Sequence, residues 1–117
     1  MKKIEVKHVK ALKNSGQEVA LINVLPKDVF QKEHIPGSIN IPLTESPDEF
    51  VQQVESVVPS KNHQIIVYCA STMCSASTTA AEALDNAGFT QVMDFKGGMD
   101  DWKKAGENIE TRKARLR

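Results

Sequence analysis

The sequence carries no excess of charge of either sign, because its 117 residues include 15 basic and 15 acidic side chains. A balanced chain has no overall field to attract nucleic acid or an anionic membrane surface. We therefore expect neither as a partner. Residues 111–117 are locally basic, and we interpret the sequence from about residue 107 onward as a solvated tail.

Long apolar runs are also missing. No segment approaches the roughly 20 apolar residues that a membrane-spanning helix needs, and the basic start Met1-Lys2-Lys3 is not followed by the apolar segment of a secretory signal. We therefore expect a cytoplasmic protein. Its 40% hydrophobic and 26% charged residues are typical of a globular domain. A chain of this length buries one core but not two, which predicts a single domain over residues 1–117.

Cysteine is scarce, since the chain has only Cys69 and Cys74. In a reducing compartment, two cysteines argue against a structural disulfide framework, and without a second pair nearby they argue against a zinc site. We expect no metal ion and no organic cofactor. The two cysteines are left with either reactivity or simple packing as small apolar side chains.

The segments that are present alternate between short apolar runs and longer amphipathic stretches, with no internal repeat and no low-complexity linker. This alternation is typical of an α/β fold. The apolar runs are expected to be strands, and they are apolar on both faces, as in the middle of a parallel sheet. They cover residues 20–25, 39–41, 65–69 and 92–95.

Helix signals lie between these strands. Ser46, Pro47 and Glu49 have the spacing of an N-cap serine, a first-turn proline and the acidic residue of a capping box. Pro59 ends the apolar pattern that follows. That pattern consists of Phe50, Val54, Val57 and Val58.

A second helix is predicted after Cys74, with Gly88 as its terminating residue. Its stripe of small residues, which predicts close packing on the sheet, is Ala76, Ala80, Ala83, Leu84 and Ala87. Shorter helices are expected near residues 9–14, 27–32 and 99–104.

Cys69 stands at the end of the strand expected over residues 65–69, directly before a small polar stretch and the alanine-rich helix. A strand-to-helix turn of this kind directs several backbone N–H groups and the positive end of the helix inward. These groups would stabilise a thiolate, the nucleophilic form of cysteine. Ligands of open parallel sheets also lie beyond the carboxyl ends of the strands. The expected fold and the position of Cys69 therefore indicate the same site, at the carboxyl end of the strand.

Several motifs, taken in order, resemble single-domain members of the rhodanese family. The first is Leu21-Ile22-Asn23-Val24, followed by residues 33–42 with the sequence EHIPGSINIP. The others are Val67-Tyr68-Cys69, the alanine-rich helix, Gly88-Phe89 and residues 95–102 with the sequence FKGGMDDW. The resemblance spans nearly the whole chain. It implies a three-layer α/β fold with a central, mostly parallel sheet of about five strands flanked by helices.

The resemblance also implies an activity. In this family the loop cysteine takes a sulfane sulfur from a donor, becomes a persulfide and passes the sulfur to a nucleophile. Cys69 would be the catalytic residue, with a small sulfur donor and a thiol, cyanide or protein-cysteine acceptor as partners. We expect a monomer or weak homodimer. The loop residues expected to bind substrate are Ala70, Ser71, Thr72, Met73, Cys74 and Ser75.

The loop departs from the family pattern Cys-x-x-Gly-x-Arg-Ser, with Thr72 for the glycine and Cys74 for the arginine. Threonine resists the positive φ that glycine permits, so the loop must take a different path or carry strain. Loss of the arginine removes a charge-assisted hydrogen bond worth about 1.5–3 kcal/mol, which predicts weak thiosulfate activity. Asn23 and Leu25 replace a common Asp and Arg, which we interpret as a rearranged network around the site. The spacing from Cys69 to Cys74 matches sulfurtransferases, not the longer loop of related phosphatase-like domains.

Two other hypotheses stay open. A rhodanese-like interaction or regulatory module would keep the fold without turnover, which the missing arginine favours and the retained nucleophile opposes. In a thiol–disulfide redox sensor, Cys74 would act as a resolving thiol that expels sulfide from a persulfide on Cys69. That requires Cα atoms within about 4.4–6.8 Å of one another.

Other side chains are interpreted structurally. We expect Ser75 to cap the following helix, His34 to hold backbone groups at a turn, and Trp102 to anchor the last helix in the core. Gly97-Gly98 fits a tight connection after the final strand and is not a phosphate loop, since no Gly-Lys-Ser/Thr follows.

Overall fold

Five parallel strands form a single sheet in the computed structural model, which describes residues 1–111. The strands are β1 (Lys2–Lys3), β2 (Val19–Asn23), β3 (Ile39–Asn40), β4 (Gln64–Tyr68) and β5 (Val92–Phe95). Their order is β1-β5-β4-β2-β3, and every neighbouring pair is parallel. β4 is central, so the strand that precedes Cys69 is paired on both sides.

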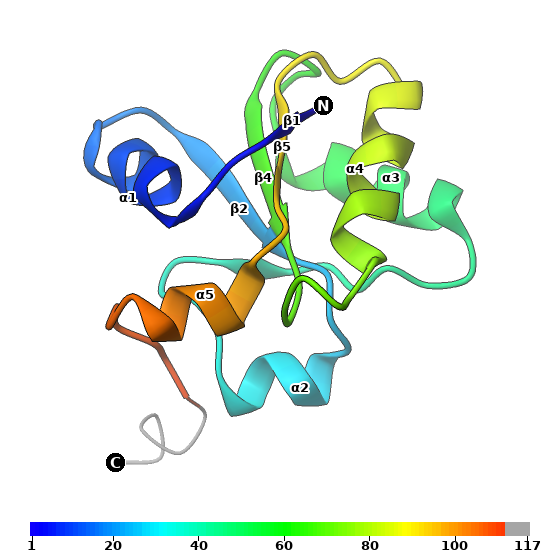
Figure 1. The fold of residues 1–117 in the computed structure, drawn as a ribbon. Coiled ribbons are helices and arrows are strands. Elements are labelled where there is room, and N and C mark those ends of the chain that lie inside the picture. The colour runs from blue at the N-terminus through cyan, green and yellow to red at the C-terminus, as the bar shows by residue number, and fades with distance from the viewer. Residues whose placement is uncertain (112–117) are drawn as a thin grey trace.

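Helices cover both faces of this sheet (Figure 1). On one face lie α3 (Pro47–Val57) and α4 (Ala76–Asn86), and on the other lie α1 (Val6–Asn14) and α5 (Gly98–Lys104). α2 (Lys27–Lys32) lies beyond the carboxyl ends of the strands. The three-layer α/β fold expected from the sequence is confirmed. No helix in the described part of the chain is long and apolar enough to cross a membrane.

Alternate side chains of β4 divide the core into two apolar clusters. Ile65 and Val67 belong to the cluster beneath α3 and α4, whereas Ile66 and Tyr68 belong to the cluster beneath α1 and α5. Both faces of the strand are therefore buried, as its continuous apolar run predicts. Cys69 belongs to the first cluster, on the side of α3 and α4.

Two strands differ from the sequence prediction. β3 is a two-residue edge strand whose Ile39 is 40% exposed, so its apolar run does not mark a central strand. The sequence does not predict β1, because its two residues are exposed lysines and carry none of the apolar pattern of a strand. Its backbone nevertheless pairs with β5, with Lys2 opposite Met93.

α3 begins where its sequence signal predicts. The Ser46 Oγ accepts a hydrogen bond from the Glu49 N–H at 3.3 Å, as an N-cap serine does. The reciprocal half of the capping box is not formed, because the Ser46 N–H donates to Thr44 Oγ1 at 3.2 Å. Val57, expected on the apolar face, is 46% exposed in the last turn.

α4 packs closely on the sheet through small side chains. Its buried residues are Ser77, Ala80, Ala81 and Leu84, whereas Ala76, Ala83 and Ala87 of the expected stripe are half-buried. The helix ends before Gly88, as predicted, and this glycine takes a φ of 95° that larger residues resist. The Phe89 N–H then donates to the Leu84 carbonyl at 3.1 Å.

Residues after α5 return to the body of the domain. Trp102 is buried, and its Nε1 donates to the Asn108 carbonyl at 2.7 Å, which confirms it as a core anchor. Glu110 and His34 exchange two backbone hydrogen bonds of 2.9 Å each. The segment from residue 107, expected to be a solvated tail, is thus attached as far as Glu110. The basic residues 112–117 lie outside the described residues.

Candidate active site

Cys69 lies at the carboxyl end of β4 and starts the loop of residues 69–75 that leads into α4. A disulfide joins it to Cys74, with 6.5 Å between the two Cα atoms. Cys69 is completely buried, while Cys74 is half-buried. In this disulfide form the Cys69 sulfur is neither a nucleophile nor accessible. Reduction must therefore precede any sulfur chemistry at Cys69.

The other residues expected to bind substrate lie along the outside of the loop. Met73 is 92% exposed, Ala70, Thr72 and Ser75 are exposed, and Ser71 is half-buried. No residue other than glycine has a positive φ among residues 1–111. Thr72 therefore follows a path that threonine tolerates, and the strain considered from the sequence does not arise.

The start of α5 holds the first two peptide groups of the loop. The Met99 N–H donates to the Cys69 carbonyl at 3.0 Å, and the Asp100 N–H donates to the Ala70 carbonyl at 2.8 Å. This approach requires Gly98, which has a φ of 57° and whose added Cβ would lie 2.1 Å from the Cys69 carbonyl oxygen. The second glycine of the Gly97-Gly98 pair thus sets the contact between α5 and the loop, beyond making a tight connection.

The orientation of these carbonyls determines where the loop amides point. Because N–H and C=O point in opposite directions across a trans peptide, the N–H groups of Ala70 and Ser71 point away from α5. The Met73 N–H donates to Ser71 Oγ at 3.3 Å and the Cys74 N–H to the Ser71 carbonyl at 3.0 Å, so these two are occupied within the loop. The N–H groups of Ala70, Ser71, Thr72 and Ser75 have no hydrogen-bond acceptor among the described residues.

Ser75 occupies the N-cap position of α4, but its side chain makes no capping hydrogen bond, so the expected cap is wrong. The reason lies in its backbone, which is already αR with φ −92° and ψ −3°, whereas a capping side chain needs an extended residue. The first turn of α4 therefore keeps uncapped N–H groups next to the cysteine loop, where they favour negative charge.

Lys96, which follows β5, reaches the same loop. Its Nζ donates to the Cys74 carbonyl at 3.2 Å, and Cys69 Sγ lies 3.6 Å from that same oxygen. Lys96 is half-buried, so its charge is only partly screened by solvent. Our sequence interpretation did not identify this residue. Alternate side chains of β5 face α4, since Val92 packs beneath α4 and Asp94 accepts a hydrogen bond from the Thr78 hydroxyl of α4. Lys96 is the next residue in this alternation, and this is the signal that could have identified it.

Tyr68 fixes the strand end directly before Cys69. It is completely buried, and its hydroxyl accepts from the Ile35 N–H at 3.0 Å and shares a hydrogen bond of 2.8 Å with Ser38 Oγ. Burial raises the Tyr68 pKa above its usual value of 10.0, an effect that its contacts with Ser38, Asn23 and Ile35 partly oppose. This residue was also missed as a positioning group, although its motif was recognised.

His34 has the structural role expected for it. Its Nδ1 lies 2.8 Å from the Phe30 carbonyl, its Nε2 lies 3.2 Å from Glu110 Oε1, and its ring stacks on Phe30 with 3.8 Å between centroids. The side chain is 6% exposed. His34 therefore joins α2 to the segment after α5.

The end of β2 lies beside the loop. Asn23 pairs with Tyr68 in the register of β2 and β4, is completely buried, and accepts a hydrogen bond from the Leu25 N–H through Oδ1 at 2.9 Å. Leu25 itself lines a pocket next to Ala70. The residues that replace the family Asp and Arg thus hold a turn and form an apolar wall, and neither brings a charge.

That pocket has a volume of about 330 Å³ and lies between the loop, α2 and α5. The charged groups of its lining are paired, Lys103 with Glu33 at 2.7 Å and Asp100 with Lys104 at 3.0 Å. A dianionic donor therefore meets no unpaired cation in the lining of this pocket. The complete lining is Leu25, Val29, Glu33, Ala70, Ser71, Met99, Asp100 and Lys103.

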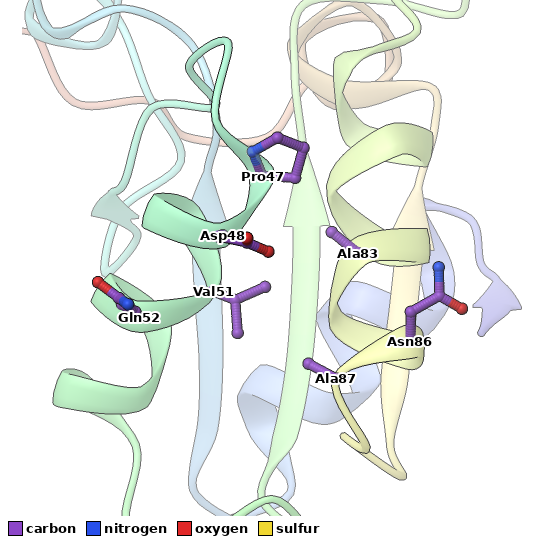
Figure 2. A pocket seen from close by; sticks show the side chains of 7 residues that line it. All are labelled: Pro47, Asp48, Val51, Gln52, Ala83, Asn86 and Ala87. Carbon is purple, nitrogen blue, oxygen red and sulfur yellow. The ribbon is translucent and has the colours of Figure 1, made fainter.

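A second pocket, of about 400 Å³, lies between α3 and α4 (Figure 2). Its lining contains no residue of the cysteine loop and no cysteine. We therefore assign the candidate active site to the loop. The lining of this second pocket is Pro47, Asp48, Val51, Gln52, Ala83, Asn86 and Ala87.

A cysteine loop at the carboxyl end of a central parallel strand, leading into a helix N-terminus, defines a class of α/β domains built around cysteine chemistry. Within that class, residues 5–105 match the family model of the rhodanese-like domain. This chain belongs to the rhodanese-like family, as its ordered motifs indicated.

Named relatives include sulfurtransferases. The chain is 36% identical over 80 residues to the thiosulfate sulfurtransferase PspE of Escherichia coli, covering 68% of this chain and 70% of that protein. It is 33% identical over 93 residues to the HTH-type transcriptional regulator Rv0324 of Mycobacterium tuberculosis, covering 80% of this chain but only 38% of the regulator. The crystal structure of a thiosulfate sulfurtransferase from Pseudomonas aeruginosa superposes with a TM-score of 0.82 at 27% identity, over 95% of this chain and 20% of that one.

Proposed function

We propose that this protein is a sulfurtransferase that carries sulfane sulfur as a persulfide on Cys69. The observation that supports it most is the position of Cys69 at the carboxyl end of β4, in a loop with four backbone N–H groups that have no acceptor among the described residues. Such donors, together with the uncapped N-terminus of α4, stabilise a thiolate and a persulfide anion.

The transfer has two steps once the disulfide is reduced. The Cys69 thiolate attacks the outer sulfur of the donor, and the bond from that sulfur to the rest of the donor breaks. With thiosulfate the leaving group is sulfite, which takes the electron pair. An acceptor thiolate or cyanide then attacks the outer sulfur of the persulfide, and Cys69 leaves as thiolate.

Charge around the site favours donors other than thiosulfate. Cys74 replaces the family arginine, and Lys103, the lysine that lines the pocket beside Ala70, is paired with Glu33. Lys96 contacts the cysteine loop at the Cys74 carbonyl, and a single ammonium group lacks the paired geometry of a guanidinium. We infer that a polysulfide or a small-molecule persulfide is a better donor than thiosulfate.

Intact-protein mass spectrometry tests the function. A Cys74→Ser variant, in which Cys69 is the one remaining cysteine, is reduced, freed of reductant, incubated with polysulfide or thiosulfate and weighed, alongside a Cys69→Ser variant. One added sulfur on a chain that contains Cys69, and none on Cys69→Ser, supports the proposal. An unmodified reduced protein would indicate a binding module without turnover, and a sulfur retained by Cys69→Ser would place the chemistry elsewhere.

A further inference from the structure

A second thiol lies within covalent reach of the proposed nucleophile. The Cys69–Cys74 disulfide has Cα atoms 6.5 Å apart, inside the range that disulfides span without moving the backbone. The Cys74 backbone is held on both sides, since its N–H donates to the Ser71 carbonyl and its carbonyl accepts from Lys96. The two sulfurs are thus brought together by the folded loop and do not depend on a chance encounter.

We propose that Cys74 is a second catalytic residue, which attacks the persulfide on Cys69 and releases the transferred sulfur as hydrosulfide. This inference rests on the proposed function, because it needs a persulfide to attack. It adds an activity, the reductive release of sulfide, to the transfer of sulfur to an outside acceptor. A loop with an arginine in place of Cys74 has no thiol for this step.

The step is a thiol–disulfide exchange inside the loop. The Cys74 thiolate attacks Cys69 Sγ, the bond between the two Sγ atoms forms, and the bond from Cys69 Sγ to the outer sulfur breaks. The electron pair leaves with the outer sulfur, which takes up a proton and departs as hydrosulfide. The outer sulfur is reduced by the two thiols, which are oxidised to the disulfide.

A dithiol must then return the loop to its reduced form. Its first thiolate attacks Cys74, its second thiolate resolves the mixed disulfide, and the dithiol leaves as its own disulfide. Over a full cycle, one sulfane sulfur and one dithiol yield one hydrosulfide and one disulfide, together with sulfite when thiosulfate is the donor.

Burial in the disulfide form explains why the reductant attacks Cys74 and not Cys69. In the disulfide form Cys69 is completely buried, so an outside reductant has no path to its Sγ. Cys74 is half-buried and is the more accessible sulfur for the reductant. Reduction through Cys74 releases Cys69 as thiolate, ready for the next donor.

The test is a single turnover without added thiol. Reduced wild-type protein and a Cys74→Ser variant are freed of reductant under anaerobic conditions and incubated with thiosulfate as the sole oxidant. Sulfide is trapped with a fluorescent alkylating reagent, and the protein is weighed intact. We expect wild-type protein to release up to one sulfide per chain and to lose two hydrogens, while loaded Cys74→Ser keeps one added sulfur and releases none.

Other results would separate the two proposals. A wild-type chain that keeps a stable added sulfur and releases no sulfide overturns the role of Cys74 and leaves the sulfurtransferase function standing. Failure of both proteins to gain sulfur or release sulfide with thiosulfate, together with failure to gain sulfur from polysulfide in the preceding assay, overturns both. A Cys74→Ala variant repeats the comparison should serine disturb folding, and circular dichroism of each variant checks the fold.

Discussion

At the scale of single residues, Cys74 determines both the charge and the redox chemistry of the loop. An arginine there would present a fixed cation to an anionic donor, whereas a thiol presents none and can pair with Cys69. The same residue type thus disfavours thiosulfate and enables sulfide release.

The charge part of this argument predicts the effect of Cys74→Arg. Restoring a charge-assisted hydrogen bond worth about 1.5–3 kcal/mol should raise kcat/KM for thiosulfate about tenfold to a hundredfold. The measurement is thiosulfate turnover with cyanide as acceptor. Cys74→Met is the matched control, since it also removes the thiol but brings no charge. Equal rates for the two variants would show that the missing arginine does not explain weak thiosulfate activity.

Lys96 is a second residue expected to affect the Cys69 thiolate, through its positive charge. Its Nζ and Cys69 Sγ both lie near the carbonyl oxygen of Cys74. Lys96→Met keeps an unbranched side chain and removes the cation, so reduced Cys69 should react more slowly with an alkylating reagent. A loss of about 1 kcal/mol of electrostatic stabilisation would slow alkylation at neutral pH about fivefold. The rate of iodoacetamide alkylation against pH, in a Cys74→Ser background, measures this. Lys96→Arg should retain the faster rate because it keeps the cation. Identical profiles for the proteins with Lys96, Lys96→Met and Lys96→Arg would show that Lys96 does not affect the thiolate.

At the scale of secondary-structure elements, the contact between α5 and the loop decides where the loop amides point. Gly98→Ala would place a Cβ against the Cys69 carbonyl at a residue with φ 57°. We expect a loss of stability of about 2–5 kcal/mol from clash and backbone strain together, and slower persulfide formation because the carbonyls of Cys69 and Ala70 lose their donors. Urea unfolding and single-turnover sulfur loading measure the two effects.

Gly106→Ala is the control for that substitution. Gly106 has a φ of 76°, but a Cβ there would meet nothing within 4 Å. It should lose only the strain component, about 1–2 kcal/mol, and load sulfur normally. If Gly98→Ala loses no more stability than Gly106→Ala and loads sulfur as fast, the close approach of α5 has no role in shaping the loop.

Elements with a periodic apolar pattern could be predicted from the sequence, and those defined by backbone contacts could not. α2 was predicted with its observed bounds, and β4 within one residue at each end. β1 and the contact of Lys96 depend on partners distant in the sequence, so their own residues carry little signal. The Ser75 prediction was wrong because residue type favours a cap while the path of the loop imposes αR backbone.

At the scale of the whole molecule, Tyr68 connects segments that lie far apart in the sequence. Its hydroxyl, at the end of β4, holds Ile35 and Ser38. The neighbouring His34 in turn holds Phe30 and Glu110. The motif over residues 33–42 is thus a clamp that ties the end of the central strand, next to Cys69, to α2 and to the segment after α5.

This clamp predicts a loss of stability at alkaline pH. Because burial raises the Tyr68 pKa above 10.0, the folded chain binds the phenolic proton more tightly than the unfolded chain. The stabilisation is complete below a pH of about 10 and is lost as pH rises through the folded-state pKa. Tyr68→Phe removes this pH dependence and lowers the free energy of unfolding at neutral pH by about 1–3 kcal/mol, since the Ile35 N–H loses its acceptor. Tyr68 is the only tyrosine in the chain, so tyrosinate absorbance follows its ionisation directly, and urea unfolding of both proteins across this range measures the linkage. A phenol that titrates at its ordinary pKa in the folded protein would contradict the buried clamp.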